Sequence, residues 1–294
     1  MGLRELIAAA ADRLAAAGVP SPRHDAETLA AHLLGVARGE LLLRPDSADA
    51  FADRYGELVD RRAGREPLQH ITGVAHFRHL TVRVGPGVFV PRPETELVAG
   101  AAIEAARAVE AAQRTPVVAD LFAGSGAIAL AVADEVPSAE VHAVEADDGA
   151  VTWLRQNAQG TRVAVHHSDV EGCLPDMSGR LDVVAANPPY VPSGATIRDP
   201  EVAAHDPAVA LWSGADGLDA MRILERTAAR LLRPGGLLIT EHADVQGEAA
   251  SAVFDATGRW ADVDDHLDLT ERPRYLTARL KPLDQPGSGA ARAR

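Results

Sequence analysis

The stretch that decides the fold is VVADLFAGSGAIALAVA, residues 117–133 of the 294-residue chain. Its first part, Val117–Phe122, is rich in β-branched and apolar residues, and its last part, Ile128–Ala133, has helical character. The glycine-rich loop Ala123–Ala127 lies between them. Glycines let the backbone approach a ligand closely, and the free N–H groups at the start of a helix point into the same space. The stretch therefore predicts a strand, a loop that cradles a nucleotide-like ligand, and a helix.

A carboxylate follows one strand further along the chain. The run Val141–Val144 reads as a strand, and the next residue, Glu145, could accept hydrogen bonds from both hydroxyls of a ribose. Asp120, just before the loop, is expected to orient it through backbone N–H groups and also to contact a cofactor. The pattern outlines an adenosine-cofactor site. Its candidate residues are Asp120, Ala123, Gly124, Ser125, Gly126, Ala127 and Glu145.

The loop by itself also fits a second class of enzyme. Gly124, Gly126 and Ala129 satisfy the G-x-G-x-x-G/A pattern of dinucleotide-dependent dehydrogenases. On this segment alone, a hydride-transfer enzyme therefore stays open.

A second motif, Asn187-Pro188-Pro189-Tyr190, directly follows the apolar run 183–186, which reads as a buried strand. An Asn-Pro pair can be a plain turn. The tetrapeptide also suits methylation of a planar nitrogen, whose delocalised lone pair must be localised before it can attack. The Asn187 side-chain oxygen and the Pro188 carbonyl can accept its two N–H hydrogens, and Tyr190 offers a face for stacking. The prolines stiffen the loop, so the acceptors are placed before a substrate arrives.

The two motifs together separate these classes of enzyme. A dehydrogenase has no need of N-P-P-Y after its glycine loop. A methyltransferase must bring the methyl group of S-adenosylmethionine and a held nitrogen together at the strand ends, where open α/β sheets bind ligands. We therefore expect an S-adenosylmethionine-dependent enzyme in which Asn187, Pro188, Pro189 and Tyr190 are catalytic and bind substrate, with Asn187 also beside the cofactor.

After residue 115, strand and helix patterns alternate, which predicts a parallel sheet covered on both faces. The last two strands have no helix between them and predict a closing antiparallel hairpin. The fold class is therefore α/β, a doubly wound, mostly parallel seven-stranded sheet of the S-adenosylmethionine-dependent methyltransferase kind. The expected strands are residues 116–121, 140–144, 162–166, 181–186, 236–241, 260–267 and 274–281.

The N-terminal part reads as helices only. Ser21 followed by Pro22 predicts the start of a second helix, and Gly35 predicts its end. We expect four parts: a small helical domain at 1–72, a β-hairpin linker at 73–92, the catalytic domain at 93–282 and a disordered tail at 283–294.

Composition narrows the class of partner. A net charge of −13 argues against bulk nucleic acid as the main partner, because phosphate contacts need clustered Lys and Arg. The single cysteine, Cys173, excludes an internal disulfide, and no histidine has zinc-like spacing, so no metal is expected. No apolar run approaches the ~20 residues of a membrane span. These features predict a cytoplasmic, monomeric protein without a membrane partner.

Two further segments are more specific than the motifs above. They are PLQHITG at 67–73 and VFVPRPETE at 88–96, and they are accompanied by Asp206-Pro207 and by Asp216-Gly217-Leu218. With these segments the chain resembles the glutamine-N5 methyltransferases that modify bacterial peptide chain release factors. The resemblance covers most of the chain.

This resemblance implies methyl transfer from S-adenosylmethionine to a glutamine side-chain amide in a release factor. It also implies that the helical domain helps to recognise this protein substrate, and that the loop of Val90 and Arg92 borders the target pocket. Asp169 and Val170 are implied to lie beside the cofactor, although some relatives carry tryptophan where Val170 stands.

Two alternatives remain at this stage. An adenine-N6 nucleic-acid methyltransferase would use the same N-P-P-Y chemistry but would need a basic recognition region to extract its base. A non-catalytic cofactor-binding protein is the other alternative, and the intact acceptor residues argue against it.

Overall fold

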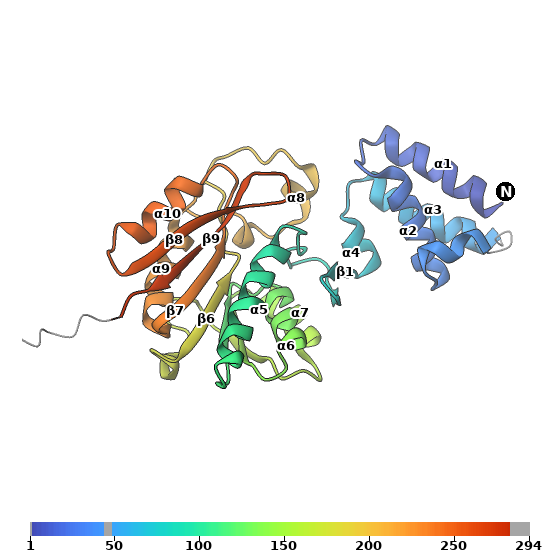
Figure 1. Cartoon of the computed structure of the whole chain (residues 1–294). Helices are drawn as coiled ribbons and strands as arrows, with labels where there is room; N and C mark the ends of the chain where they lie inside the picture. The colour runs from blue at the N-terminus through green and yellow to red at the C-terminus, as the bar shows by residue number, and fades with distance from the viewer. Residues whose placement is uncertain (1, 44–48, 283–294) are drawn as a thin grey trace, which may run out of the picture. The chain divides into compact units, whose positions relative to one another are not determined.

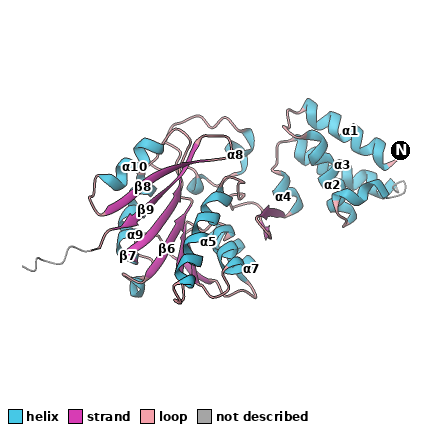
Figure 2. Ribbon diagram, in the orientation of Figure 1, coloured by secondary structure: helices cyan, strands magenta, loops and turns pink. Residues whose placement is uncertain are grey.

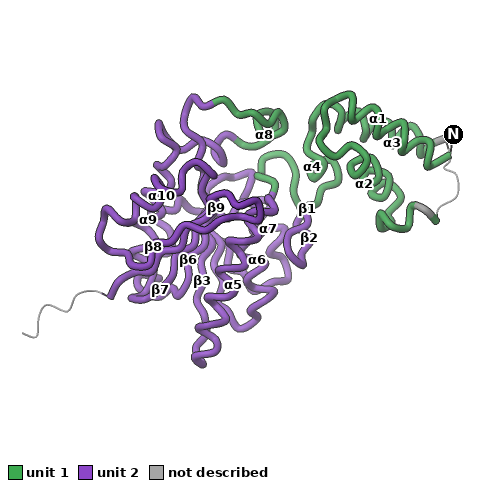
Figure 3. Tube along the Cα trace, turned by 45° about the horizontal axis from the view of Figure 1, so that its top comes forward, with its two compact units in different colours: residues 1–75, 83–90, 196–207 green, residues 76–82, 91–195, 208–294 purple. Residues whose placement is uncertain are grey.

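The computed structural model of the chain describes residues 2–43 and 49–282. The expected disordered tail, residues 283–294, lies outside the described residues. The chain divides into two compact units (Figure 3). One comprises residues 1–75, 83–90 and 196–207, and the other comprises residues 76–82, 91–195 and 208–294.

The first unit is helical. Its apolar core includes Leu14 and Leu29, and the buried Tyr55 hydroxyl donates a hydrogen bond to the Ala26 carbonyl at 2.8 Å. Pro22 begins the second helix as expected, and Gly35 ends it in the left-handed conformation at φ 64°. The helices are α1 Leu3–Ala16, α2 Pro22–Leu34, η1 Arg38–Leu43, α3 Asp49–Ala63, α4 Leu68–Thr72 and α8 Pro200–His205.

A two-stranded hairpin is present within the expected 73–92 segment, but it is shorter. Strand β1 is Val74–Phe77 and β2 is Leu80–Arg83. The chain reverses at Arg78, which has a positive φ of 52°, whereas Gly85-Pro86-Gly87 lies beyond the second strand. The turn at Arg78-His79 contains neither Gly nor Pro. The residues that usually mark a turn, here Gly85-Pro86-Gly87, lie further along the chain.

The second unit is built on a seven-stranded sheet in the order β5-β4-β3-β6-β7-β9-β8 (Figures 1 and 2). Neighbouring strands are parallel from β5 to β7, and β9 runs antiparallel to both β7 and β8. The expected doubly wound sheet with a closing hairpin is confirmed. The strands are β3 Val117–Leu121, β4 Glu140–Glu145, β5 Ala164–His167, β6 Leu181–Ala186, β7 Leu232–Glu241, β8 Trp260–Leu267 and β9 Pro273–Leu280.

Strand β7 begins four residues before the expected start. Leu232 pairs with Leu181, but the next pair along the ladder is Val183 with Leu237, so the ladder is irregular between them. The intervening Arg233-Pro234-Gly235-Gly236 is a strong turn signal, and Gly235 has a φ of 79°. A reading of the sequence therefore places the strand after this segment, whereas the structure accommodates the segment as a bulge.

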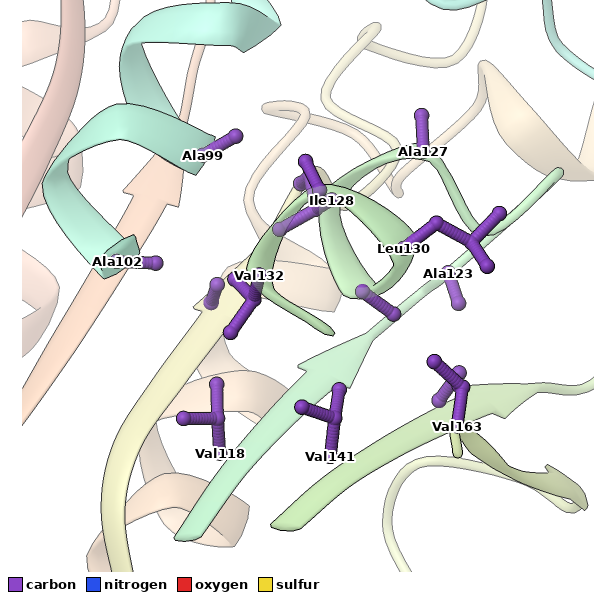
Figure 4. Packing of buried hydrophobic residues seen from close by; sticks show 14 of the residues in the cluster. Ala99, Ala102, Val118, Ala123, Ala127, Ile128, Leu130, Val132, Val141 and Val163 are labelled. Atoms are coloured by element: carbon purple, nitrogen blue, oxygen red, sulfur yellow. The ribbon is translucent and has the colours of Figure 1, made fainter. Parts of the chain in front are cut away.

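Helices cover both faces of the sheet (Figure 1). Helices α5 Thr95–Ala111, α6 Ala127–Glu135 and α7 Asp148–Ala158 pack on one face. Helices α9 Asp219–Leu231 and α10 Gly247–Asp255 belong to the core on the other. Figure 4 shows the first core, where α6 lies over the β-branched side chains of β3 and β4. Alanine and valine dominate this core.

The order of the strands fixes where a ligand can bind. From β3 the chain continues outward through β4 and β5, and then returns to place β6 on the other side of β3. The last residues of the two neighbours, Leu121 of β3 and Ala186 of β6, are direct partners in the ladder. Open α/β sheets bind ligands at the carboxyl ends of strands at such a reversal. The N-P-P-Y segment begins one residue after this pair and the glycine loop two residues after it.

Candidate active site

The glycine loop leaves β3 through a sharp change of backbone direction. Phe122 has a φ of 67°, Gly124 of 56° and Gly126 of 88°. At Gly126, a Cβ atom would lie 2.6 Å from the Leu154 Cδ1 atom, so both the conformation and the space require glycine. At Gly124, no atom lies within 4 Å of a built Cβ, so this part of the loop faces open space.

Glu145, at the end of β4, holds this loop. Its Oε2 atom accepts a hydrogen bond from the Gly124 N–H at 2.7 Å, and its Oε1 atom accepts one from the Asp147 N–H at 2.8 Å. Each carboxylate oxygen has two lone pairs, so both oxygens keep one acceptor site for a ribose hydroxyl. The sequence indicated the ribose role but not the hydrogen bond to the loop.

Asp120 is buried and holds the helix that follows the loop. Its Oδ2 atom accepts a hydrogen bond from the Ala129 N–H of α6 at 3.0 Å, one turn beyond the loop that it was expected to orient. Its Oδ1 atom has no hydrogen-bond partner within residues 2–43 and 49–282. Burial raises the pKa of this carboxyl to about 8. A buried polar oxygen without a partner, close to an open glycine loop, fits a site that a polar cofactor such as S-adenosylmethionine completes.

The other predicted cofactor residues lie in the loop itself or just beyond β5. Ser125 is buried, and its carbonyl accepts a hydrogen bond from the Asn157 side chain at 3.0 Å. Ala123 and Ala127 are also buried. Beyond β5, the Ser168 N–H donates a hydrogen bond to the carbonyl of Glu145, the last residue of β4. The next residue, Asp169, is exposed. Val170 is buried in the apolar core.

Asn187 is held by two residues to which the sequence analysis gave no role. Its Nδ2 atom donates a hydrogen bond to the Thr95 Oγ1 atom at 3.2 Å, and the Thr95 hydroxyl donates to Glu241 Oε2 at 2.7 Å. Neither the Asn187 Oδ1 atom nor the Pro188 carbonyl receives a hydrogen bond from the part of the chain that the structure describes. Two features of the sequence could have pointed to these partners: Thr95 lies in the PRPETE segment, and Glu241 lies at the end of an expected strand.

Tyr190 is half-buried, and the charge of the Glu241 carboxylate acts on its hydroxyl. Burial raises the pKa of this hydroxyl above its usual range. The Tyr190 carbonyl accepts a hydrogen bond from the Gln246 side chain at 3.0 Å. The backbone of Tyr190 is therefore tied to the segment that follows β7.

The chain beyond Tyr190 is anchored by the segment 211–217. The Val191 N–H donates to the Leu211 carbonyl at 2.7 Å, and the Ser193 N–H donates to the Gly214 carbonyl at the same distance. A Cβ atom at Gly217 would lie 2.4 Å from the Tyr190 carbonyl oxygen. The backbone of Gly217 therefore packs closely against the Tyr190 carbonyl, and the segment that contains it helps to hold the N-P-P-Y loop in place.

The two remaining predicted substrate residues fall in different units. Val90 is buried and belongs to the helical unit, and Arg92 belongs to the sheet unit. The Arg92 carbonyl accepts a hydrogen bond from the Thr95 N–H at 3.1 Å. Arg92 is thus only three residues from the side chain that holds Asn187.

Within the described residues, no group of three or more His, Cys, Asp or Glu side chains could hold a metal ion. None of the described helices is long and apolar enough to cross a membrane.

Comparison with known proteins shows the family to which the chain belongs. A model of the PrmC N-terminal domain matches residues 5–73, and a model of the methyltransferase small domain matches residues 80–202. The release factor glutamine methyltransferase of Streptomyces coelicolor strain A3(2) is 56% identical, covering 93% of this chain and 96% of that protein. The chain belongs to the release factor glutamine methyltransferase family. The release factor glutamine methyltransferase of Mycolicibacterium smegmatis is 47% identical over 94% of this chain and 97% of its own length.

A relative with a different substrate shows that this family likeness extends beyond release factors. The 4-amino-L-phenylalanine/4-methylamino-L-phenylalanine methyltransferase of Streptomyces pristinaespiralis is 41% identical, covering 88% of this chain and 89% of that protein. Its name gives amino acids with an amino or methylamino group as substrates.

Proposed function

We propose that this protein transfers a methyl group from S-adenosylmethionine to the side-chain amide nitrogen of a glutamine in a peptide chain release factor. The observation that carries the proposal is the direct pairing of Leu121 with Ala186, because it brings the glycine loop and the N-P-P-Y loop to neighbouring strand ends. Identity of 56% to a release factor glutamine methyltransferase over nearly the whole chain supports this substrate.

In the mechanism, this chain binds and orients the nitrogen. The Asn187 Oδ1 atom and the Pro188 carbonyl accept its two N–H hydrogens, and the ring of Tyr190 packs against the planar amide. Holding both hydrogens in one plane directs the lone pair out of it, toward the glycine loop. The bound cofactor supplies an electrophilic methyl group on a sulfonium sulfur. The methylated nitrogen becomes acidic and loses one proton to water, so no strong base is required.

On the cofactor side, Ala123–Ala127 would cradle the ligand, and the second lone pairs of Glu145 would take the ribose hydroxyls. The Asp120 Oδ1 atom is the buried polar atom that a polar group of the cofactor would satisfy. Asp169 and Val170 are proposed to border the adenine.

On the substrate side, we assign Val90 and Arg92 to the border of the target pocket and residues 1–72 to recognition of the release factor. In this proposal, residues 73–92 link that domain to the catalytic domain at 93–282. We also expect a monomer that works in the cytoplasm without nucleic acid, in keeping with the net charge of −13.

The first test is mass spectrometry of purified release factors incubated with the protein and S-adenosylmethionine. One added methyl group on a single glutamine is the expected result. 4-Amino-L-phenylalanine and duplex DNA are offered in parallel. Methylation of either one, with the release factors unmodified, would refute the proposed substrate.

The Asn187→Ala variant tests the role of the loop in the same assay. Removing the acceptor should lower turnover by on the order of a hundredfold, with cofactor affinity within a few-fold of the wild type, since the Asn187 oxygen acts on the transferred centre. Equal losses in turnover and in cofactor affinity would contradict that role.

A further inference from the structure

Asn187, Thr95 and Glu241 form a chain of hydrogen bonds drawn from three separate elements. Asn187 follows β6, Thr95 is the first residue of α5, and Glu241 is the last residue of β7. Thr95 and Glu241 are buried, with 4% and 1% of their surfaces exposed. Water therefore has little access to either group, and each depends on its partners in the protein.

The direction of these hydrogen bonds follows from counting protons. An ionised carboxylate can only accept, so Glu241 takes the single proton of the Thr95 hydroxyl. Only lone pairs of the Thr95 oxygen then face Asn187. Thr95 can therefore accept a hydrogen bond from Asn187 but cannot donate one to it. The Asn187 NH₂ group must face Thr95, as it does at 3.2 Å, and the Oδ1 atom must face away. A flipped amide would set two acceptor oxygens against each other in a buried site, which costs free energy.

We propose that Thr95 and Glu241 are positioning residues, which keep the Asn187 side-chain oxygen turned toward the nitrogen that is methylated. This inference rests on the proposed function, because it assigns the Asn187 oxygen as the acceptor for the substrate N–H. Neither residue touches the substrate in this proposal. They act by fixing one of the two orientations of an amide that would otherwise be free to turn over.

The charge of Glu241 controls the arrangement. Burial raises the pKa of Glu241 to about 7, whereas the hydrogen bond from Thr95 and the charge of Arg274 oppose this rise. The charge of Glu94 adds to the rise, and the Tyr190 hydroxyl opposes it. These groups belong to the start of α5, to the N-P-P-Y loop and to β9. His242, the first residue after β7, is paired with Asp265.

Protonation of Glu241 would undo the arrangement. The neutral carboxyl can donate its proton to Thr95, and the Thr95 hydroxyl then turns to Asn187 as a donor, which favours the flipped amide. Activity should therefore rise as pH increases through about 7.

The first test compares Thr95→Val with Thr95→Ser. Valine keeps the shape of threonine and removes the hydroxyl, and it should lower kcat/KM for release factor about 10- to 100-fold while cofactor affinity stays within about threefold. Serine keeps the hydroxyl and should restore kcat/KM to within about threefold of the wild type. Melting temperatures of both variants separate this effect from loss of folded protein. Equal activity of the wild type and Thr95→Val, or equal loss in both variants, would overturn the inference.

The second test is the pH profile of Glu241→Gln. Glutamine still offers an oxygen to Thr95 but does not titrate, so the rise in activity near pH 7 should disappear. Persistence of that rise in Glu241→Gln would assign it to another group, such as Asp120, and would contradict the role of Glu241.

A third measurement needs no substrate. In ¹⁵N-labelled protein, the side-chain amide signals of Asn187, identified by their loss in Asn187→Asp, should shift with pH about a midpoint near 7. The shift should be absent in Glu241→Gln and in Thr95→Val, and its presence in both would overturn the inference. A wild type that shows this titration but does not methylate release factors would refute the proposed function and leave the orientation of Asn187 established.

Discussion

At the scale of single residues, the buried carboxyl of Asp120 makes the stability of the fold depend on pH. Its pKa is raised to about 8 in the folded chain, whereas an unfolded aspartate titrates near 4, so the folded state holds a proton that the unfolded state loses between these values. Its contribution to stability is therefore complete below pH 4 and is lost as pH rises toward 8. Glu241 acts in the same direction with a pKa of about 7.

Asp120→Asn should remove the part of this pH dependence that belongs to Asp120. Asparagine keeps an acceptor for the Ala129 N–H but does not titrate. One proton difference changes the free energy of unfolding by about 1.4 kcal/mol per pH unit, so the slope between pH 5 and 7.5 should decrease by up to that amount. Urea denaturation at several pH values measures it, with the exposed Asp176→Asn as the control. An unchanged slope in Asp120→Asn would show that this carboxyl is ionised in the folded protein.

Residue types were enough to find part of the site. N-P-P-Y, the glycine loop and Glu145 are local patterns, and the structure places them at neighbouring strand ends. The partners of Asn187 were not found in this way, because Thr95 lies 92 residues and Glu241 lies 54 residues away in sequence. Only the folding of α5 and β7 against β6 brings these side chains together. The second acceptor role of Glu145, on the loop itself, was missed for the same reason.

At the scale of elements, the glycine loop depends on a close contact between α6 and α7. Gly126 precedes α6 with a positive φ, and a Cβ atom there would overlap the Leu154 side chain of α7. Gly160 also has a positive φ, of 76°, but nothing lies within 4 Å of a built Cβ. An alanine at either position would therefore pay the cost of a positive φ. Only the alanine at position 126 would also clash with a neighbouring side chain.

Gly126→Ala should be more destabilising than Gly160→Ala by about 1 to 3 kcal/mol, the usual cost of overpacking a close contact. It should also weaken S-adenosylmethionine binding, because the displaced loop carries Gly124, whereas Gly160→Ala should leave binding unchanged. Calorimetric titration with the cofactor and thermal unfolding measure the two effects. If both variants lose the same stability and affinity, the contact with Leu154 has no influence on the loop.

The alternation of strand and helix patterns along the chain was enough to predict which strands exist. The residues at which the strands begin and end were harder to predict. The parallel strands are buried on both faces and therefore read as apolar runs. β7 starts before a Pro-Gly-Gly segment that normally marks a turn, and β1 and β2 reverse at Arg78-His79 without a glycine. Both misplacements come from tertiary pairing that overrides local turn preference.

At the scale of the whole molecule, a buried ionic cluster ties a distant segment to the helical unit. The Arg62 side chain is only 5% exposed and contacts Asp25 at 2.7 Å and Glu201 at 2.8 Å. Arg65 contacts the same Glu201 carboxylate at 2.8 Å. Glu201 lies in α8, within residues 196–207, which follow the N-P-P-Y loop in the chain but belong to the helical unit.

Arg62→Leu should lower the free energy of unfolding of the helical unit by about 3 kcal/mol, because it leaves the buried Asp25 carboxylate without its partner. The adjacent Arg61 is the matched control. Its side chain is 45% exposed and pairs with Glu66, so Arg61→Leu should cost about 1 kcal/mol or less. Hydrogen exchange of the α1 to α3 amides measures both. Equal effects of the two substitutions would mean that the cluster does not stabilise the unit.

The path of residues 196–207 limits how this protein can be divided. A fragment cut at the hairpin would keep Arg62 and Arg65 but lack the Glu201 carboxylate. The complementary fragment would carry Glu201 without these two arginines. Neither piece would be a self-contained module.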